Sequence, residues 1–158
     1  MTDNDRKFMA RAIELAKIGV ETNAGGPFGC VVVKDGEIVG EGSNSVTSTN
    51  DPTAHAEVVA IRNACLALDS FQLDGCTIYT SCEPCPMCLG AIYWARPEQV
   101  FYACTRDDAA AVGFDDDFIY KELGKNNGER ELELTNLMRD ESLEVFAHWA
   151  AKPDKTEY

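Results

Sequence analysis

The chain has 158 residues, of which 45% are hydrophobic, and its 27 acidic and 14 basic residues give a formal net charge of −13. This length and apolar content fit a single folded domain over residues 1–158 and exclude a disordered chain. A protein that grips a nucleic acid needs clustered Lys and Arg side chains, so the acidic composition argues against DNA or RNA as a partner.

The sequence shows no sign of a membrane or export segment. No apolar run approaches the roughly 18 residues that a membrane span needs, and the polar stretch from Met1 to Lys7 is not a secretory signal. We therefore expect a cytoplasmic protein without a membrane partner, whose seven cysteines form no disulfide framework. Four cysteines are expected to be buried as small apolar side chains: Cys30, Cys65, Cys76 and Cys104.

The first half of the chain predicts a helix, a β-hairpin and a second helix. Apolar residues recur at helical spacing in two segments, and Thr53 is the expected N-cap of the second helix. A Val-rich run before Asp35-Gly36 predicts a buried strand that turns back on itself. The predicted elements are a helix over 5–20, strands over 28–34 and 37–43, a polar loop over 43–52 and a helix over 53–68.

The second half continues with alternating strands and helices. Its predicted elements are strands over 76–80 and 99–103, a helix over 86–95, short helices over 107–112 and 117–123, a strand over 130–134 and a helix over 141–149. This order predicts an α/β fold with three layers, an αβα sandwich around a mixed sheet.

Two short motifs carry the chemistry. His55-Ala56-Glu57 and Pro84-Cys85-Pro86-Met87-Cys88 each lie near a predicted helix start, where partial positive charge favours thiolates. Imidazole nitrogen and thiolate sulfur suit zinc, so His55, Cys85 and Cys88 are the predicted ligands, with a fourth position left for water. Glu57 is predicted to reach that water and the substrate as a proton shuttle. The paired motifs match the signature of the zinc-dependent base deaminases.

Other uses of these cysteines are weaker explanations. A closed structural zinc site would add Cys82 to the three ligands, but it would leave Glu57 without a role. An iron–sulfur cluster lacks the further cysteine that follows in the usual spacing, and a redox pair would leave the His55 motif unexplained. Cys82 is interpreted as a buried thiol at a strand end.

Over nearly its whole length the sequence resembles the cytidine deaminase superfamily, and most closely the branch that deaminates guanine. The matching segments are Gly25–Gly29, Asn50–Glu57, Tyr79–Pro97 and Gly113–Asp116. The resemblance implies a five-stranded mixed sheet between helices and one zinc per subunit. It also implies that water activated by zinc attacks C2 of guanine, giving xanthine and ammonia, while Glu57 moves the protons.

The resemblance extends to the residues around the base. It implies that Asn44 hydrogen-bonds the base, that Ala56 contributes to substrate binding, and that Phe28 and Trp94 form pocket walls. It assigns Asp116 to recognition of the guanine edge and to a proton relay.

The resemblance also implies a homodimer in which the segment over 140–158, a helix and tail, crosses to the partner subunit. Tyr158 would then enter the partner's active site.

Four other functions compete with guanine deamination. A tRNA adenosine deaminase would need a basic surface, and a riboflavin-pathway deaminase would normally bring a second domain. Cytosine or cytidine deamination stays the nearest rival, because specificity depends on few contacts. A structural zinc module for protein interactions would need neither an open ligand position nor Glu57.

Overall fold

The computed structural model describes residues 2–114 and 116–158. The chain divides into two units, one that ends at Asp117 and one that runs from Phe118 to Tyr158. Of the predicted site residues, Tyr158 alone belongs to the second unit. Among the described residues, no helix is long and apolar enough to cross a membrane.

The first unit is built on a mixed sheet of four strands in the order β2-β1-β3-β4. Strand β1 runs antiparallel to both of its neighbours, and β3 and β4 are parallel. Asp35 and Gly36 both have positive φ, as the predicted tight hairpin turn requires. The strands are β1 (Gly29–Lys34), β2 (Glu37–Ser43), β3 (Cys76–Cys82) and β4 (Gln99–Cys104).

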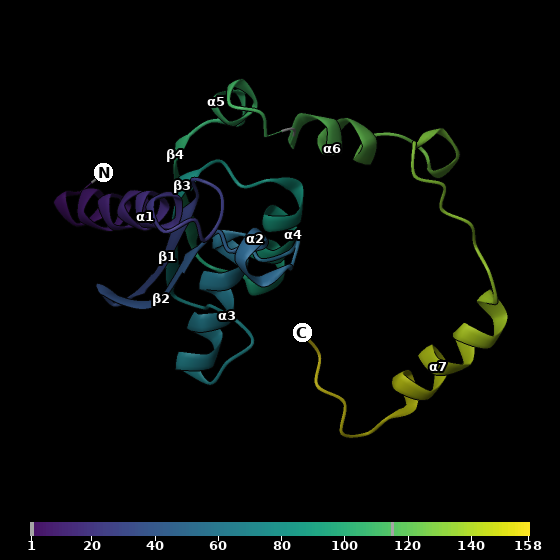
Figure 1. Ribbon diagram of the computed structural model, residues 1–158. Helices are drawn as coiled ribbons and strands as arrows, with labels where there is room; N and C mark the ends of the chain where they lie inside the picture. The colour runs from purple at the N-terminus through teal and green to yellow at the C-terminus, as the bar shows by residue number, and fades with distance from the viewer. Residues whose placement is uncertain (1, 115) are drawn as a thin grey trace. The chain divides into compact units, whose positions relative to one another are not determined.

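Helices cover both faces of this sheet, which confirms the predicted αβα layers (Figure 1). Helix α1 (Asp3–Glu21) packs on the face where Val31 and Tyr79 form one apolar cluster. Helices α3 (Ala56–Leu68) and α4 (Pro86–Ala95) cover the other face, where a second cluster is centred on β1 and β3.

Glycines in the strands let two helices lie unusually close to the sheet. A Cβ added at Gly29 would meet the Ala12 carbonyl oxygen of α1 at 2.1 Å, and one added at Gly42 would meet the Ala56 carbonyl oxygen of α3 at 2.3 Å. Neither contact leaves room for a side chain. The start of α3 is therefore held against β2 by backbone packing.

Two predicted segments differ from the structure, whereas the bounds of the other predicted helices and strands found there agree to within two residues. Helix α3 begins at Ala56 rather than at Thr53, because the backbone N–H and the hydroxyl of Thr53 both donate to the Asp51 carboxylate, at 2.8 and 2.7 Å. Such a local turn competes with helix formation. The predicted loop over 43–52 contains a single helical turn, α2 (Val46–Thr49).

After β4 the first unit continues through α5 (Arg106–Ala111). The prediction that Cys104 is buried is wrong: it is exposed, because it ends the edge strand β4. Cys30 and Cys76 are buried as predicted, and Cys65 is partly buried.

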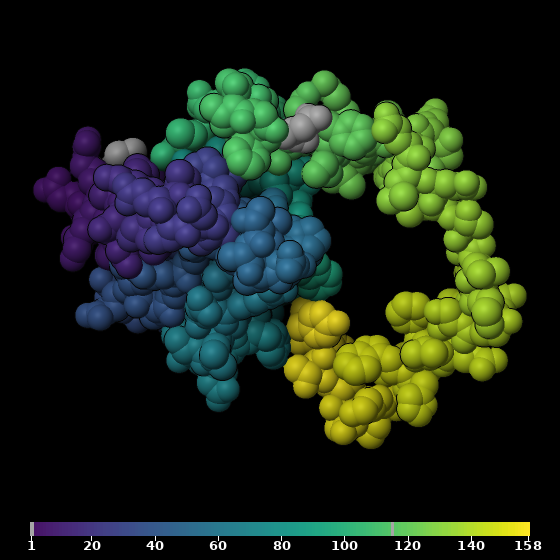
Figure 2. Space-filling model, viewed as in Figure 1, coloured from purple at the N-terminus to yellow at the C-terminus, as the bar shows by residue number. Residues whose placement is uncertain are grey.

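The second unit has little cover of its own. It contains most of α6 (Asp116–Leu123), the 3-10 helix η1 (Asn127–Glu129) and α7 (Arg139–Ala151), none of which contains a buried residue. In the space-filling view the segments of this unit, green to yellow, follow one another along the chain and pack little against each other (Figure 2).

The segment over 130–134 is irregular, so the prediction of a strand there is wrong. An alternating sequence forms a strand when a neighbouring strand pairs with it, and among the described residues the second unit contains no strand. The predicted five-stranded sheet is accordingly a four-stranded one.

Candidate metal centre and substrate cavity

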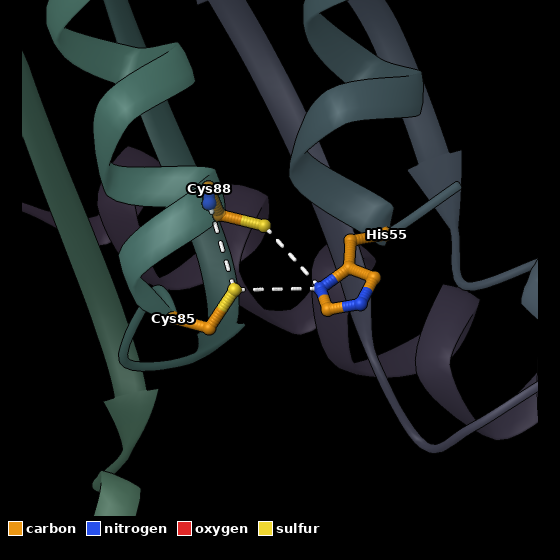
Figure 3. Close-up of side chains that lie close together, drawn as sticks. All are labelled: His55, Cys85 and Cys88. Atoms are coloured by element: carbon orange, nitrogen blue, oxygen red, sulfur yellow. Dashed lines mark hydrogen bonds between the residues drawn. The ribbon is translucent and has the colours of Figure 1, made fainter. Parts of the chain in front are cut away.

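The three predicted metal ligands meet at the ends of two helices. The Nδ1 atom of His55 lies 3.5 Å from the Sγ atom of Cys85 and 3.5 Å from that of Cys88 (Figure 3). One ligand atom from each residue lies within 4.8 Å of the others. Zinc bonds of about 2.0–2.1 Å to nitrogen and about 2.3 Å to sulfur, set at tetrahedral angles, put N and S about 3.5 Å apart. The donor set and spacing therefore fit zinc.

Local backbone structure explains why these side chains converge. His55 is the N-cap of α3 and Cys85 the N-cap of α4, both with extended backbone. Pro86 suits the first turn of α4, and the Cys88 backbone N–H donates to the Cys85 sulfur at 3.5 Å. The helix that follows Cys85 thus points an N–H group and its partial positive charge at the sulfur.

The charges at this centre favour a ligand-ready thiolate. A hydrogen bond from Cys88, together with His55, lowers the pKa of Cys85 to about 4. The same hydrogen bond with Cys85, together with burial, raises the pKa of Cys88. The hydrogen bond between His55 and Cys85 also raises the pKa of His55. Without metal, the two thiols hold one negative charge between them, and a dication would stabilise the second.

Glu57 is the second residue of α3, two positions after His55, and is almost completely buried. Burial raises the pKa of its carboxyl group above the usual range. The Thr80 hydroxyl of β3 donates to its Oε1 atom at 3.1 Å. A carboxyl group held at a cavity wall, with its pKa raised above the usual range, is suited both to take up and to release a proton.

Cys82 does not belong to the metal group. It is buried at the end of β3, and its thiol donates to the Thr105 carbonyl at 3.5 Å. Burial raises its pKa to about 11, so it stays a neutral thiol. The interpretation of Cys82 as a strand-end thiol is confirmed.

A cavity of about 220 Å³ opens beside the metal group. It lies below the roughly 300–1,000 Å³ of pockets for drug-sized ligands, so it suits a small molecule such as one nucleobase. Its lining combines acidic, amide and aromatic side chains, and consists of Gly26, Phe28, Asn44, Val46, Thr47, His55, Glu57, Glu83, Cys85, Phe114 and Asp116.

Asn44 has a fixed orientation at the cavity wall. Its Oδ1 atom accepts from the backbone N–H of Gly26 at 3.0 Å and of Val46 at 3.3 Å. Two donors to one atom settle which end of the amide is oxygen. The NH2 end is therefore available to donate to a bound molecule.

The structure places one of the two predicted aromatic walls at the cavity and the other away from it. Phe28 lines the cavity and meets Phe114 edge to face, with ring centroids 4.8 Å apart. Trp94 does not line it: the indole is 63% exposed on α4, because Ile92 and Ala95 occupy the helix face that packs on the sheet. Phe114 was missed as a site residue, although it lies within the matching segment Gly113–Asp116.

Asp116 lines the cavity, as predicted, and its charge is one of the causes that raise the pKa of His55. Ala56 is fully buried at the start of α3 and is not among the lining residues. Glu83 was not predicted as a site residue. Its carboxylate accepts from the Arg106 backbone N–H at 3.1 Å, which joins the loop between β3 and α4 to the start of α5. Tyr158 belongs to the second unit, and its predicted role stays a prediction.

Comparison with known proteins gives one consistent family. Residues 2–104 match the family described as the cytidine and deoxycytidylate deaminase zinc-binding region. The chain is 57% identical to the guanine deaminase of Bacillus subtilis over 155 residues, 98% of this chain and 99% of that protein. The X-ray structure of that enzyme covers 100% of this chain and 99% of its own, at 56% identity and a TM-score of 0.95.

More distant matches include a purine complex and a tRNA deaminase. A solved structure in complex with 2,6-diaminopurine is 32% identical, covers 73% of this chain and 64% of its own, and has a TM-score of 0.68. The tRNA-specific adenosine deaminase of Aquifex aeolicus is 46% identical over 77 residues, 49% of this chain and 51% of that protein. The similar proteins thus include deaminases and a structure with a bound purine.

Proposed function

Because this chain belongs to the cytidine and deoxycytidylate deaminase family, we propose that it is a zinc-dependent hydrolase that converts guanine to xanthine and ammonia. The observation that carries the proposal is the cavity itself. It places His55 and Cys85 beside the buried acid Glu57, with Asp116 also in its lining and room for one base.

The protein's own groups account for the proton transfers. A zinc ion held by His55, Cys85 and Cys88 would lower the pKa of a water molecule to about 7. Glu57 would accept a proton as water attacks C2 of guanine and deliver it to N3. It would then accept the proton of the new C2 hydroxyl group and pass it to the departing amino group, which leaves as ammonia. Its raised pKa matches both the accepting and the donating role.

Recognition of the base is proposed to use the walls of the cavity. The Asn44 NH2 group is free of its backbone contacts and would donate to a ring acceptor. The Asp116 carboxylate would accept from the N–H groups that guanine presents and take part in proton relay. The Phe28 and Phe114 rings, which contact each other edge to face, would form an apolar wall against the base.

The test is ammonia release from guanine, cytosine, cytidine, adenine and adenosine in parallel. We expect turnover of guanine above the others, and a loss of about 10²–10⁴-fold in Glu57→Gln with zinc retained, the usual contribution of acid–base catalysis. Preference for cytosine would overturn the substrate, and zinc binding without any turnover would support a structural module. Activity on tRNA is disfavoured by the net charge of −13.

We also propose that the active form is a homodimer in which the segment over 140–158 crosses to the partner and places Tyr158 in the partner's site. Apolar side chains of the second unit support this, since Leu132 and Phe146 are 74% and 68% exposed. Exposed apolar surface of this extent is typical of an interface. The cytoplasmic location stays a prediction.

A further inference from the structure

Thr80 is a polar side chain at the centre of the sheet, where apolar residues are the rule. It lies on β3 opposite Cys30 of β1 and Tyr102 of β4, and only 1% of it is exposed. Side chains alternate along a strand, so Thr80 shares with Ile78 the face that α3 and α4 cover. A valine would fill the same volume there without a hydroxyl to satisfy.

The hydroxyl of Thr80 has a defined partner. It donates to the Oε1 atom of Glu57 at 3.1 Å, across the space between β3 and the first turn of α3. Thr80 is not among the residues that line the cavity. Its contact with the site therefore passes through the Glu57 carboxylate.

The Thr80 hydroxyl is a hydrogen-bond donor that carries no charge, so it can donate to Glu57 whether or not metal is bound. Its β-branched side chain in a central strand has few rotamers, so it holds one carboxylate oxygen in place.

We propose that Thr80 is a positioning residue for the deamination reaction. It fixes Oε1 of Glu57 by a hydrogen bond from behind, so that the other oxygen is presented to the attacking water and the base. This inference rests on the proposed role of Glu57 as the proton shuttle.

The decisive variants are Thr80→Val, which keeps the shape and removes the hydroxyl, and Thr80→Ser, which keeps the hydroxyl. In the zinc-loaded enzyme, we expect Thr80→Val to lower kcat by about 10- to 100-fold, as for a lost hydrogen bond to a charged group, with KM for guanine and zinc content unchanged. Thr80→Ser should retain most of the kcat. Thr77→Val is the matched control, since Thr77 lies on the same strand and points to the opposite face.

A second readout does not depend on turnover. In a crystal structure of zinc-loaded Thr80→Val, the Glu57 carboxylate should be rotated or spread over several positions, and in Thr80→Ser it should keep one. In a Glu57→Gln background, adding Thr80→Val should cause no further loss of kcat. A merely structural role would lower the melting temperature without this coupling.

Three results would overturn the inference: a kcat of Thr80→Val within about twofold of wild type, equal losses in the Val and Ser variants, or loss of zinc that accounts for the loss of activity. If Thr80→Val does not fold, an unmoved Glu57 carboxylate in Thr80→Ala would overturn it as well. If the wild-type enzyme does not turn over guanine, the proposed function fails, and the structural readout on Glu57 still decides the role of Thr80.

Discussion

The two units of this chain differ in how far they bury their apolar side chains. The unit that ends at Asp117 encloses them between a sheet and three helices, and its metal group lies in that frame. The unit from Phe118 to Tyr158 leaves every residue of its helices at least partly exposed. The first unit therefore holds the candidate site and the core that supports it, whereas the second unit leaves apolar side chains that its own fold does not cover.

The largest expected effect tests whether a second copy of this chain covers the exposed apolar side chains of the second unit. Deletion of residues 154–158 should lower guanine deamination by about 10-fold or more while zinc stays bound, because a substrate-positioning group is lost. The Glu57→Gln chain should be inactive for a different reason, because it lacks the proposed proton shuttle. Co-expression of the truncated chain and the Glu57→Gln chain should raise activity above that of either alone, because a subunit with intact Glu57 would receive the tail of its partner.

The same mixture distinguishes an exchanged tail from a local one. If Tyr158 served its own subunit, every site in a mixed dimer would lack either Glu57 or the tail, and no activity would return. Size-exclusion chromatography of each chain alone is the control, since both should be dimers. Full activity of the truncated chain by itself would remove the reason to link the second unit to the site.

A smaller effect probes the close packing that supports the metal group. In Gly42→Ala the new methyl group would lie 2.3 Å from the Ala56 carbonyl and 2.6 Å from the Ala60 nitrogen, so α3 must move away from β2. We expect a loss of about 1–3 kcal/mol in the free energy of unfolding, as for overpacked cores. Zinc affinity should fall too, because α3 carries His55 at its start.

The matched control is Gly90→Ala on α4, where an added Cβ meets nothing within 4 Å. This change should keep or raise stability, since alanine favours a helix over glycine by about 1 kcal/mol. Thermal unfolding of the two variants measures the difference. Equal stability of Gly42→Ala and wild type would show that backbone packing does not set the position of α3.

The smallest effect concerns an ion pair that joins α1 to β2 within the first unit. Hydrogen bonds from Arg11, at 2.8 Å to each carboxylate oxygen, lower the pKa of Glu41. A lowered pKa in the folded state stabilises the protein above the ordinary glutamate value of about 4.3, and this contribution is lost as the pH falls through the folded pKa.

Because both side chains are one-third exposed, the expected contribution is about 0.5 kcal/mol at pH 7. Urea unfolding of Arg11→Met should show this deficit at pH 7 and a vanishing one at the acid end of the titration. A deficit that is independent of pH would assign the effect to packing of the Arg11 stem.

The metal group could be predicted from sequence because short motifs fix it locally. His55 and Cys85 each occupy a helix N-cap, and Cys88 follows within the first turn. The αβα order was likewise readable from hydrophobic spacing. Thr80 and Phe114 were missed because their roles arise from contacts with residues far along the chain, which no local pattern records.

Predictions were least accurate where the partner of a segment is not its neighbour in the sequence. Residues 130–134 alternate like a strand, but strand formation needs an edge to pair with, and they are irregular here. Trp94 looks like a pocket wall in sequence, but the helical phase set by Ile92 turns it away from the cavity.

The spacing of the metal ligands has a consequence for stability. His55 and Cys85 are 30 residues apart in sequence, and a zinc ion bound to both would tie the two ends of this loop together. Because the unfolded chain does not hold the ligands in place, the free energy of zinc binding would add to the free energy of unfolding. The loop contains α3 and β3, so metal supply would govern how much of the sheet survives denaturant as well as whether the enzyme is active.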